Sequence, residues 1–161
     1  MVSRRDLGSW LSGATWSAGE PAPAWRGERL GAPAAGPGAM AGYGPRLLAL
    51  GCDWAACLLI ASALAPGAVL GDPDSGLLTL LIFIAEVTVL TAVAGGSFGQ
   101  LLVGLRVVRV QPSGVTTVAA DPARALLRTL LLAIVLPAII VDADGRGLHD
   151  RFAGTALVRR R

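Results

Sequence analysis

Residues 46–64 read Arg-Leu-Leu-Ala-Leu-Gly-Cys-Asp-Trp-Ala-Ala-Cys-Leu-Leu-Ile-Ala-Ser-Ala-Leu, and this stretch decides the fold. It is long and apolar enough to form a helix that crosses a bilayer. Asp53 follows Arg46 by seven residues, and seven steps of about 100° return to nearly the same helix face. A carboxylate in lipid costs about 2.5–3.5 kcal/mol on an insertion scale, so Asp53 requires either a partner or a functional role. The stretch therefore predicts a membrane helix with Arg46 and Asp53 on one stripe.

The composition places the whole chain in the membrane class. Of its 161 residues, 53% are apolar and 16% are charged, whereas a soluble domain has about 25% charged residues. The net charge of +3 comes without a basic stripe carrying interleaved aromatic residues, so we expect no nucleic-acid partner. The sequence contains no nucleophile motif, phosphate-binding glycine loop or metal-ligand set. We therefore expect no enzyme activity, no catalytic residue, no bound metal and no cofactor.

Apolar runs predict an all-α membrane protein, a small bundle of three membrane-embedded segments at residues 47–64, 77–94 and 123–141. Residues 1–42, rich in Gly, Ala, Pro and Ser, are predicted to form a flexible tail before a membrane domain at 43–159. The sequence Asp121-Pro122 predicts the start of the third segment, with an N-cap followed by proline at the first helical position.

A connector follows the second segment, and its second half allows two structures. Residues 105–110 are rich in β-branched side chains. They are able to pair with residues 115–118 as a short hairpin through the turn at 111–114. Alternatively, they lie on the membrane surface with their arginines among the headgroups.

Arginines predict which parts of the chain face the cytoplasm. They gather in the N-terminal tail, the connector and the C-terminal tail, so the positive-inside rule places all three in the cytoplasm and requires an even number of crossings. Only thirteen uncharged residues separate Arg128 from Asp142, about 20 Å of helix, and Pro137 interrupts them. The third segment is therefore either broken or re-entrant, or an ordinary span into which Arg124 and Arg128 reach. The side of the C-terminus stays open.

Charged residues in the segments suggest a polar cluster near the inner face. In antiparallel helices, Asp53 and Glu86 would lie at similar depths, about 9 and 12 Å from the cytoplasmic face, with Arg128 nearby. The set fits interhelical ion pairs, a proton or cation path, or a site for a lipid headgroup or partner. His149, beside Asp150, fits either a proton relay or a residue that orients a turn.

Four motifs resemble the RDD family of bacterial integral membrane proteins. They fall in the family's order and together cover roughly residues 43–159. Gln100 departs from the pattern, because the family commonly has lysine there. The matching stretches are Arg46–Asp53, Gly99–Val108, Arg124–Arg128 and Leu148–Thr155.

The resemblance implies that Arg46, Asp53 and Asp150 are the arginine and two aspartates for which the family is named. It also implies a few transmembrane helices, with activity mostly unassigned and transport suggested for some members. We expect a multi-pass protein of the bacterial cytoplasmic membrane with a cytoplasmic N-terminus. We further expect Asp150 to fold back onto Arg46, so that one arginine serves two carboxylates.

For function, the sequence favours a structural or accessory role in the lipid bilayer, with a membrane-protein partner or a homo-oligomer. The alternative is an oligomeric ion or proton transporter that uses Asp53 and Glu86, because three short segments are too few to enclose a pathway.

Overall fold

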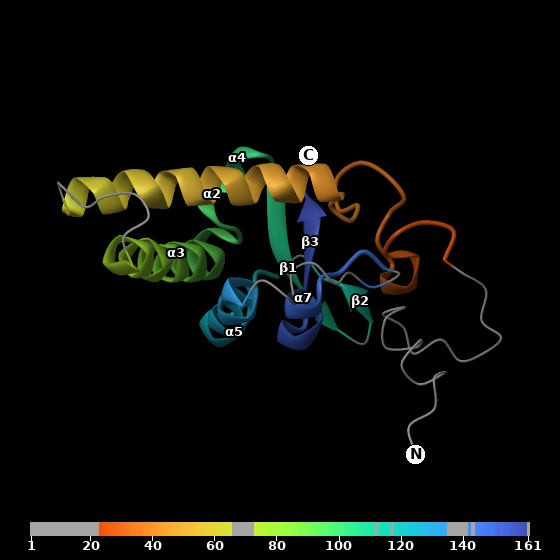
Figure 1. The fold of residues 1–161 in the computed structure, drawn as a ribbon. Helices are drawn as coiled ribbons and strands as arrows, with labels where there is room; N and C mark the ends of the chain where they lie inside the picture. Colours follow the sequence, from red (N-terminus) through yellow and green to blue (C-terminus); the bar gives the residue numbers. More distant parts are fainter. Residues whose placement is uncertain are drawn as a thin grey trace, which may run out of the picture.

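The computed structural model describes residues 23–65, 73–111, 113–116, 118–134, 142 and 144–160. Within them, two long helices come before a region of short helices and strands (Figure 1). The elements, in chain order, are η1 (Glu28–Leu30), α2 (Tyr43–Leu64), α3 (Pro73–Ala94), α4 (Phe98–Leu102), β1 (Leu105–Gln111), β2 (Gly114–Val115), α5 (Pro122–Ala133), α7 (Leu148–Ala153) and β3 (Thr155–Arg159).

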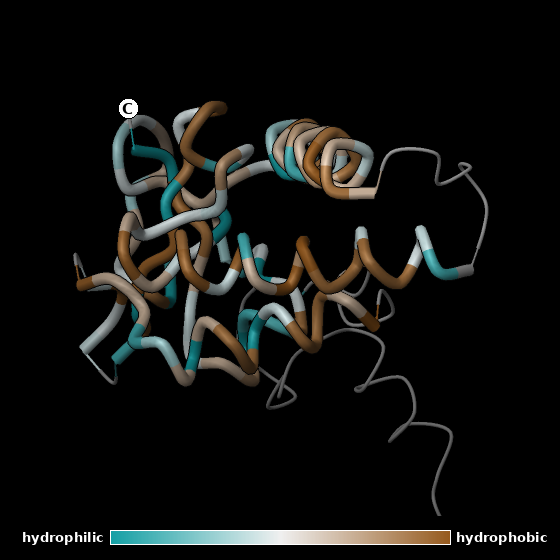
Figure 2. Tube along the Cα trace, turned by 90° about the vertical axis from the view of Figure 1, so that its left-hand side faces the viewer, coloured by the Kyte–Doolittle hydropathy of each residue, from teal (hydrophilic) through white to brown (hydrophobic). Residues whose placement is uncertain are grey.

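The helices α2 and α3 confirm the first two predicted helical segments. Each has 22 residues and begins four residues before the predicted start. Both are long and apolar enough to cross a membrane, and hydrophobic residues run along most of α3 in Figure 2. Figure 1 shows α2 lengthwise, whereas Figure 2 shows it end-on with α3 lengthwise, so the two helices cross steeply.

The faces of α2 have the polarity of a lipid-exposed helix. Its buried residues are Ala49, Asp53, Cys57 and Ala61, spaced four apart on one stripe. Large leucines such as Leu59 lie exposed on its other faces. A helix of a soluble protein buries its leucines and exposes its charges. The reversed arrangement is stable where the surroundings are hydrocarbon.

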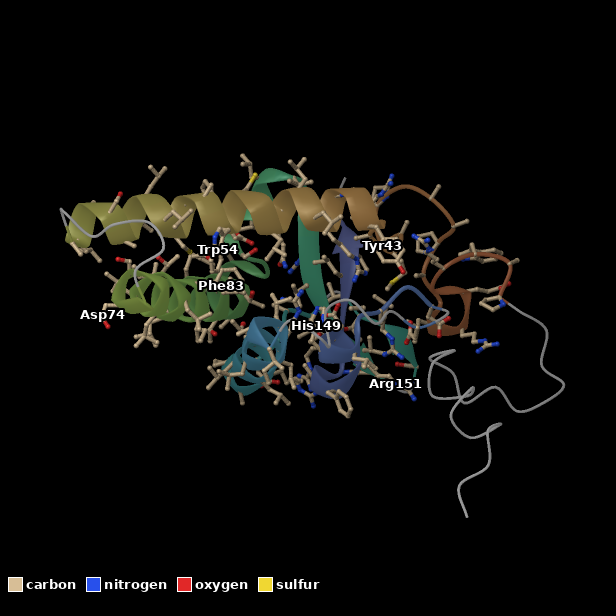
Figure 3. All side chains as sticks on the ribbon, viewed as in Figure 1. Tyr43, Trp54, Asp74, Phe83, His149 and Arg151 are labelled. Atoms are coloured by element: carbon tan, nitrogen blue, oxygen red, sulfur yellow. The ribbon has the colours of Figure 1, made fainter. Side chains whose placement is uncertain are left out.

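Aromatic and aliphatic side chains join α2 to α3. Trp54 and Phe83 meet edge to face with ring centroids 5.8 Å apart, and both point into the space between the helices in Figure 3. Cys57 and Val87 pack in the same small core. This contact fixes where the C-terminal half of α2 crosses α3.

A three-stranded antiparallel sheet shows that the all-α prediction was wrong. Its strand order is β2-β1-β3. The hairpin alternative for the connector is confirmed by the pairing of Val110 with Val115. On its other edge, β1 pairs with β3, where Leu105 lies opposite Arg159 and Val107 lies opposite Leu157. The sheet forms because β1 is rich in β-branched residues and finds a partner at the end of the chain.

The segment just before α2 extends this sheet. Met40 forms a bridge with Val158, and the backbone N–H of Ala41 donates to the carbonyl of Leu157. Met40 and Val158 also share a buried core with Val108. Residues 23–42 were expected to belong to a flexible tail, but part of this stretch pairs with β3. The pairing forms because backbone groups beside an open strand edge find hydrogen-bond partners there. Residues 1–22 lie outside the described residues.

The third predicted segment begins as expected. The side chain of Asp121 accepts a hydrogen bond from the N–H of Arg124, and Pro122 opens α5, which confirms the predicted N-cap. α5 packs along α3, burying Arg128 and Thr129 and exposing leucines such as Leu127. It ends at Ala133, and residues 135–141 lie outside the described residues. The count of three membrane-embedded segments is therefore not confirmed.

Candidate functional site

A short helix lies at the centre of the first polar site. Ser97 caps the N-terminus of α4, and its hydroxyl accepts from the backbone N–H of Gln100. The side chain of Gln100 in turn accepts from the N–H of Ser97, 3.2 Å away. This capping box satisfies two of the N–H groups that a helix start leaves without partners.

Two carboxylates from the long helices satisfy the remaining N–H groups of this first turn. Asp53 of α2 accepts from the N–H of Gly99 and, at 2.6 Å, from the hydroxyl of Ser97. Glu86 of α3 accepts from the N–H of Phe98 at 2.8 Å. Hydrogen bonds to a charged acceptor contribute about 1.5–3 kcal/mol each. Asp53 and Glu86 therefore bind α4 to both long helices. We call these two carboxylates, together with residues 97–100, the α4 cap cluster.

The second polar site is centred on Asp150 in α7, which is completely buried. The Nε of Arg128 in α5 donates to its Oδ1 over 2.6 Å, and the hydroxyl of Thr155 donates to the same oxygen over 3.0 Å. Nη1 of Arg46 lies 3.7 Å from Oδ2, and Nε2 of His149 lies 3.5 Å from it. We call these residues the Asp150 cluster. It joins α2, α5, α7 and β3 at one point.

Arg46 also fastens two backbone segments to the first turn of α2. Its Nε donates to the carbonyl of Ala41 over 3.1 Å, and its Nη2 donates to the carbonyl of Gly145 over 2.7 Å. The planar guanidinium group makes such divergent contacts with little loss of side-chain freedom. Arg46 therefore holds the chain before α2 and the chain before α7 together.

The charges around Asp150 decide its protonation state. Burial alone would raise the pKa of its carboxyl, but the positive groups of Arg128, His149 and Arg46 outweigh this effect. The pKa lies well below its usual range, so Asp150 is ionised at neutral pH.

Acid is expected to weaken the Asp150 cluster. Because the pKa is depressed from 3.8 in the folded chain, the ionised carboxyl stabilises the fold fully above about pH 4, and this stability is lost as the pH falls through the folded pKa. The difference in unfolding free energy between the wild type and Asp150→Asn should shrink as the pH falls below about pH 4. Urea unfolding in detergent measures it. An equal difference at pH 3 and pH 7 would contradict the assignment.

The structure confirms one predicted contact and contradicts another. Asp150 folds back onto Arg46 as expected, with Nη1 of Arg46 3.7 Å from its Oδ2. The expectation that Arg46 and Asp53 meet was wrong, since Asp53 binds α4 and Arg46 contacts Asp150. The two residues do share a helix face, but seven residues separate them by about 10 Å along the axis. We expected one arginine to contact two carboxylates. Instead, one carboxylate, that of Asp150, contacts two arginines, Arg46 and Arg128.

The remaining predicted residues divide between the two clusters. Glu86 meets Asp53 indirectly, through consecutive N–H groups of α4. Arg128 and His149 join Asp150 instead. His149 lies toward the middle of the molecule, whereas Asp74 lies at the far end of α3 (Figure 3).

Sequence reasoning missed the groups that satisfy the carboxylates. Ser97, Gly99 and Thr155 were not singled out, yet each donates to Asp53 or Asp150. The pattern Ser97-x-x-Gln100 is a capping-box signature. It could have indicated a short helix start, although not which carboxylates cap it.

The two clusters hold elements of the fold together. Among the described residues, no group of three or more His, Cys, Asp or Glu side chains is arranged to hold a metal ion. Ser97, the hydroxyl beside Asp53, is fully buried and serves as a helix cap.

The chain matches a protein-family model. The model described as the RDD family matches residues 40–154, more than two thirds of the chain. This range includes both clusters apart from Thr155. No curated protein and no solved structure matches the chain.

Proposed function

The chain belongs to the RDD family of membrane proteins, and from this premise we propose that it has a structural or accessory role in the bacterial cytoplasmic membrane. Its N-terminus and connector face the cytoplasm, in accord with the arginines that flank the long helices. The protein carries out no catalysis and binds a membrane-protein partner or a second copy of itself.

The α4 cap cluster is the observation that carries this proposal. Asp53 and Glu86 are the carboxylates in the interior of the two candidate membrane helices, and backbone N–H groups of α4 engage both. A carboxylate in lipid is tolerated when it is paired. Here the pairing fixes α4 and the sheet against the membrane helices, which is a structural task.

The exposed apolar side chains of the long helices support a partner within the bilayer. Leu47, Leu59 and Val93 are each more than two thirds exposed. In a membrane such surfaces face lipid or another helix, and close packing of helices adds dispersion energy.

One observation favours the alternative of an oligomeric ion or proton transporter. Oε2 of Glu86 is buried without a hydrogen-bond partner among the described residues. A buried, unpartnered carboxylate oxygen near a second carboxylate is a feature of ion paths. Transport would then use Asp53 and Glu86 between copies of the chain.

The variant Asp53→Asn separates the two roles. For the structural role, we expect the wild-type protein in proteoliposomes to show no ion flux above empty vesicles. The variant should then show several-fold lower abundance in the membrane, because a charged cap of α4 is lost. The exposed Asp74→Asn serves as the control and should keep normal abundance. Flux by the wild type that disappears in an abundant, folded Asp53→Asn protein would establish the transporter instead.

A further inference from the structure

A basic cavity lies where the first candidate membrane helix begins. It has a volume of about 330 Å³, within the roughly 300–1,000 Å³ usual for ligand sites. Its walls come from Pro45 at the start of α2, Leu101 and Leu102 of α4, and Arg159 and Arg160 at the end of β3. No carboxylate lines the cavity. Two positive charges beside aliphatic walls form a site for an amphiphilic anion.

Backbone hydrogen bonds hold the two arginines in place from both sides. The N–H of Arg159 donates to Ala39 over 2.8 Å, and its carbonyl accepts from Gly38 over 2.9 Å. The N–H of Arg160 donates to Gly104 over 2.8 Å. Their side chains remain exposed, and no ion pair joins either to a carboxylate in the part of the chain that the structure describes. The positions are therefore fixed while both guanidinium groups are available.

In a bilayer that α2 crosses, the cavity lies at the level of the lipid headgroups. Pro45 is the third residue of α2, so the cavity adjoins the very start of a candidate membrane span. Leu102, which lines it, is 66% exposed, and Leu47, two residues beyond Pro45, is 68% exposed. Phosphates gather at this depth, with acyl chains directly beyond them. Guanidinium groups bind phosphate oxygens through paired N–H donors.

We propose that this cavity binds the phosphate headgroup of an anionic phospholipid, with an acyl chain lying along Leu101 and Leu102. The proposal rests on the membrane location of the family and is independent of whether the role is structural or transport. A free inorganic phosphate shares the headgroup's charge but lacks the chain that the leucines would contact. A phospholipid should therefore bind more tightly than free phosphate, and this difference distinguishes the two ligands.

The test compares the full-length wild type with Arg159→Gln/Arg160→Gln in nanodiscs. The discs contain phosphatidylcholine with increasing phosphatidylglycerol, and native mass spectrometry counts the bound lipid. Two arginines near an anionic surface together strengthen binding by about thirtyfold, so the double variant should need about thirtyfold more phosphatidylglycerol for the same occupancy. The double variant Arg29→Gln/Arg151→Gln removes the same charge at positions that do not line the cavity, where both arginines have contacts of their own, so its phosphatidylglycerol occupancy should match that of the wild type.

Other outcomes would overturn the proposal. Equal phosphatidylglycerol occupancy in the wild type and Arg159→Gln/Arg160→Gln would exclude the cavity as the site. If inorganic phosphate displaced the lipid at comparable concentrations, the site would be one for a soluble anion. Arg159→Lys/Arg160→Lys keeps the charge and guards against misfolding, since it should restore much of the occupancy that the glutamine variant loses. The melting temperature of each variant in pure phosphatidylcholine reports its folding.

Discussion

Asp150→Asn is expected to lower the free energy of unfolding by about 3–5 kcal/mol, the cost of removing one partner from a buried ion pair. The substitution preserves shape but removes the charge that Arg128 and Arg46 share. Arg128 is almost completely buried, and its Nη1 already lacks a partner among the described residues. Chemical unfolding in mixed micelles, followed by circular dichroism, measures the loss at neutral pH.

The control for this variant is Asp74→Asn. Asp74 is an exposed carboxylate in the first turn of α3, far from the Asp150 cluster (Figure 3). Its replacement should change stability by less than about 0.5 kcal/mol. If Asp150→Asn were equally mild, the cluster would not hold the elements together.

A double variant tests whether the loss of stability comes from the buried charge of Arg128, which Asp150→Asn leaves without a carboxylate. Adding Arg128→Met to Asp150→Asn removes this guanidinium group as well. The two effects should be non-additive, with a coupling of at least about 1 kcal/mol, because the side chains are in direct contact. Strict additivity would place the cost elsewhere, for example in the bond between Thr155 and Asp150.

The long helices were predictable from sequence because their signal is local. An apolar run with a single charged residue needs only composition and length to be recognised, and both ends at Leu64 and Ala94 agree with the prediction. The first four residues of each helix were missed for a local reason as well. They contain Pro45 and Pro73, which suggest turns but are tolerated in the first turn of a helix.

The sheet and the carboxylate partners were harder to predict because they depend on distant contacts. β3 pairs with β1 across more than 40 residues, and its five residues carry little signal alone. Helical periodicity placed Arg46 and Asp53 on one face but contained no information on what lies opposite each turn. Gly99 and Ser97 therefore replaced the arginine expected at Asp53.

Gly99→Ala is expected to destabilise the protein by about 3–5 kcal/mol. A Cβ at this position would overlap the backbone carbonyl oxygen of Ala49 and would come within 2.9 Å of Oδ1 of Asp53. α4 would have to move away from α2, at the cost of about 1–3 kcal/mol for overpacking. The movement would also stretch the hydrogen bond from Gly99 to Asp53, worth about 1.5–3 kcal/mol. Unfolding of the purified variant in detergent measures the total.

Gly51→Ala supplies the matched control, since it makes the same change on the neighbouring helix. A Cβ at position 51 would meet no atom within 4 Å, and alanine in a helix is favoured over glycine by about 0.5–1 kcal/mol. The two alanines should therefore shift stability in opposite directions. If Gly99→Ala were neutral, α4 would not lie against α2, and Asp53 would need another partner. The structural role proposed for the α4 cap cluster would then lose its basis, because that role requires α4 to touch both membrane helices at once.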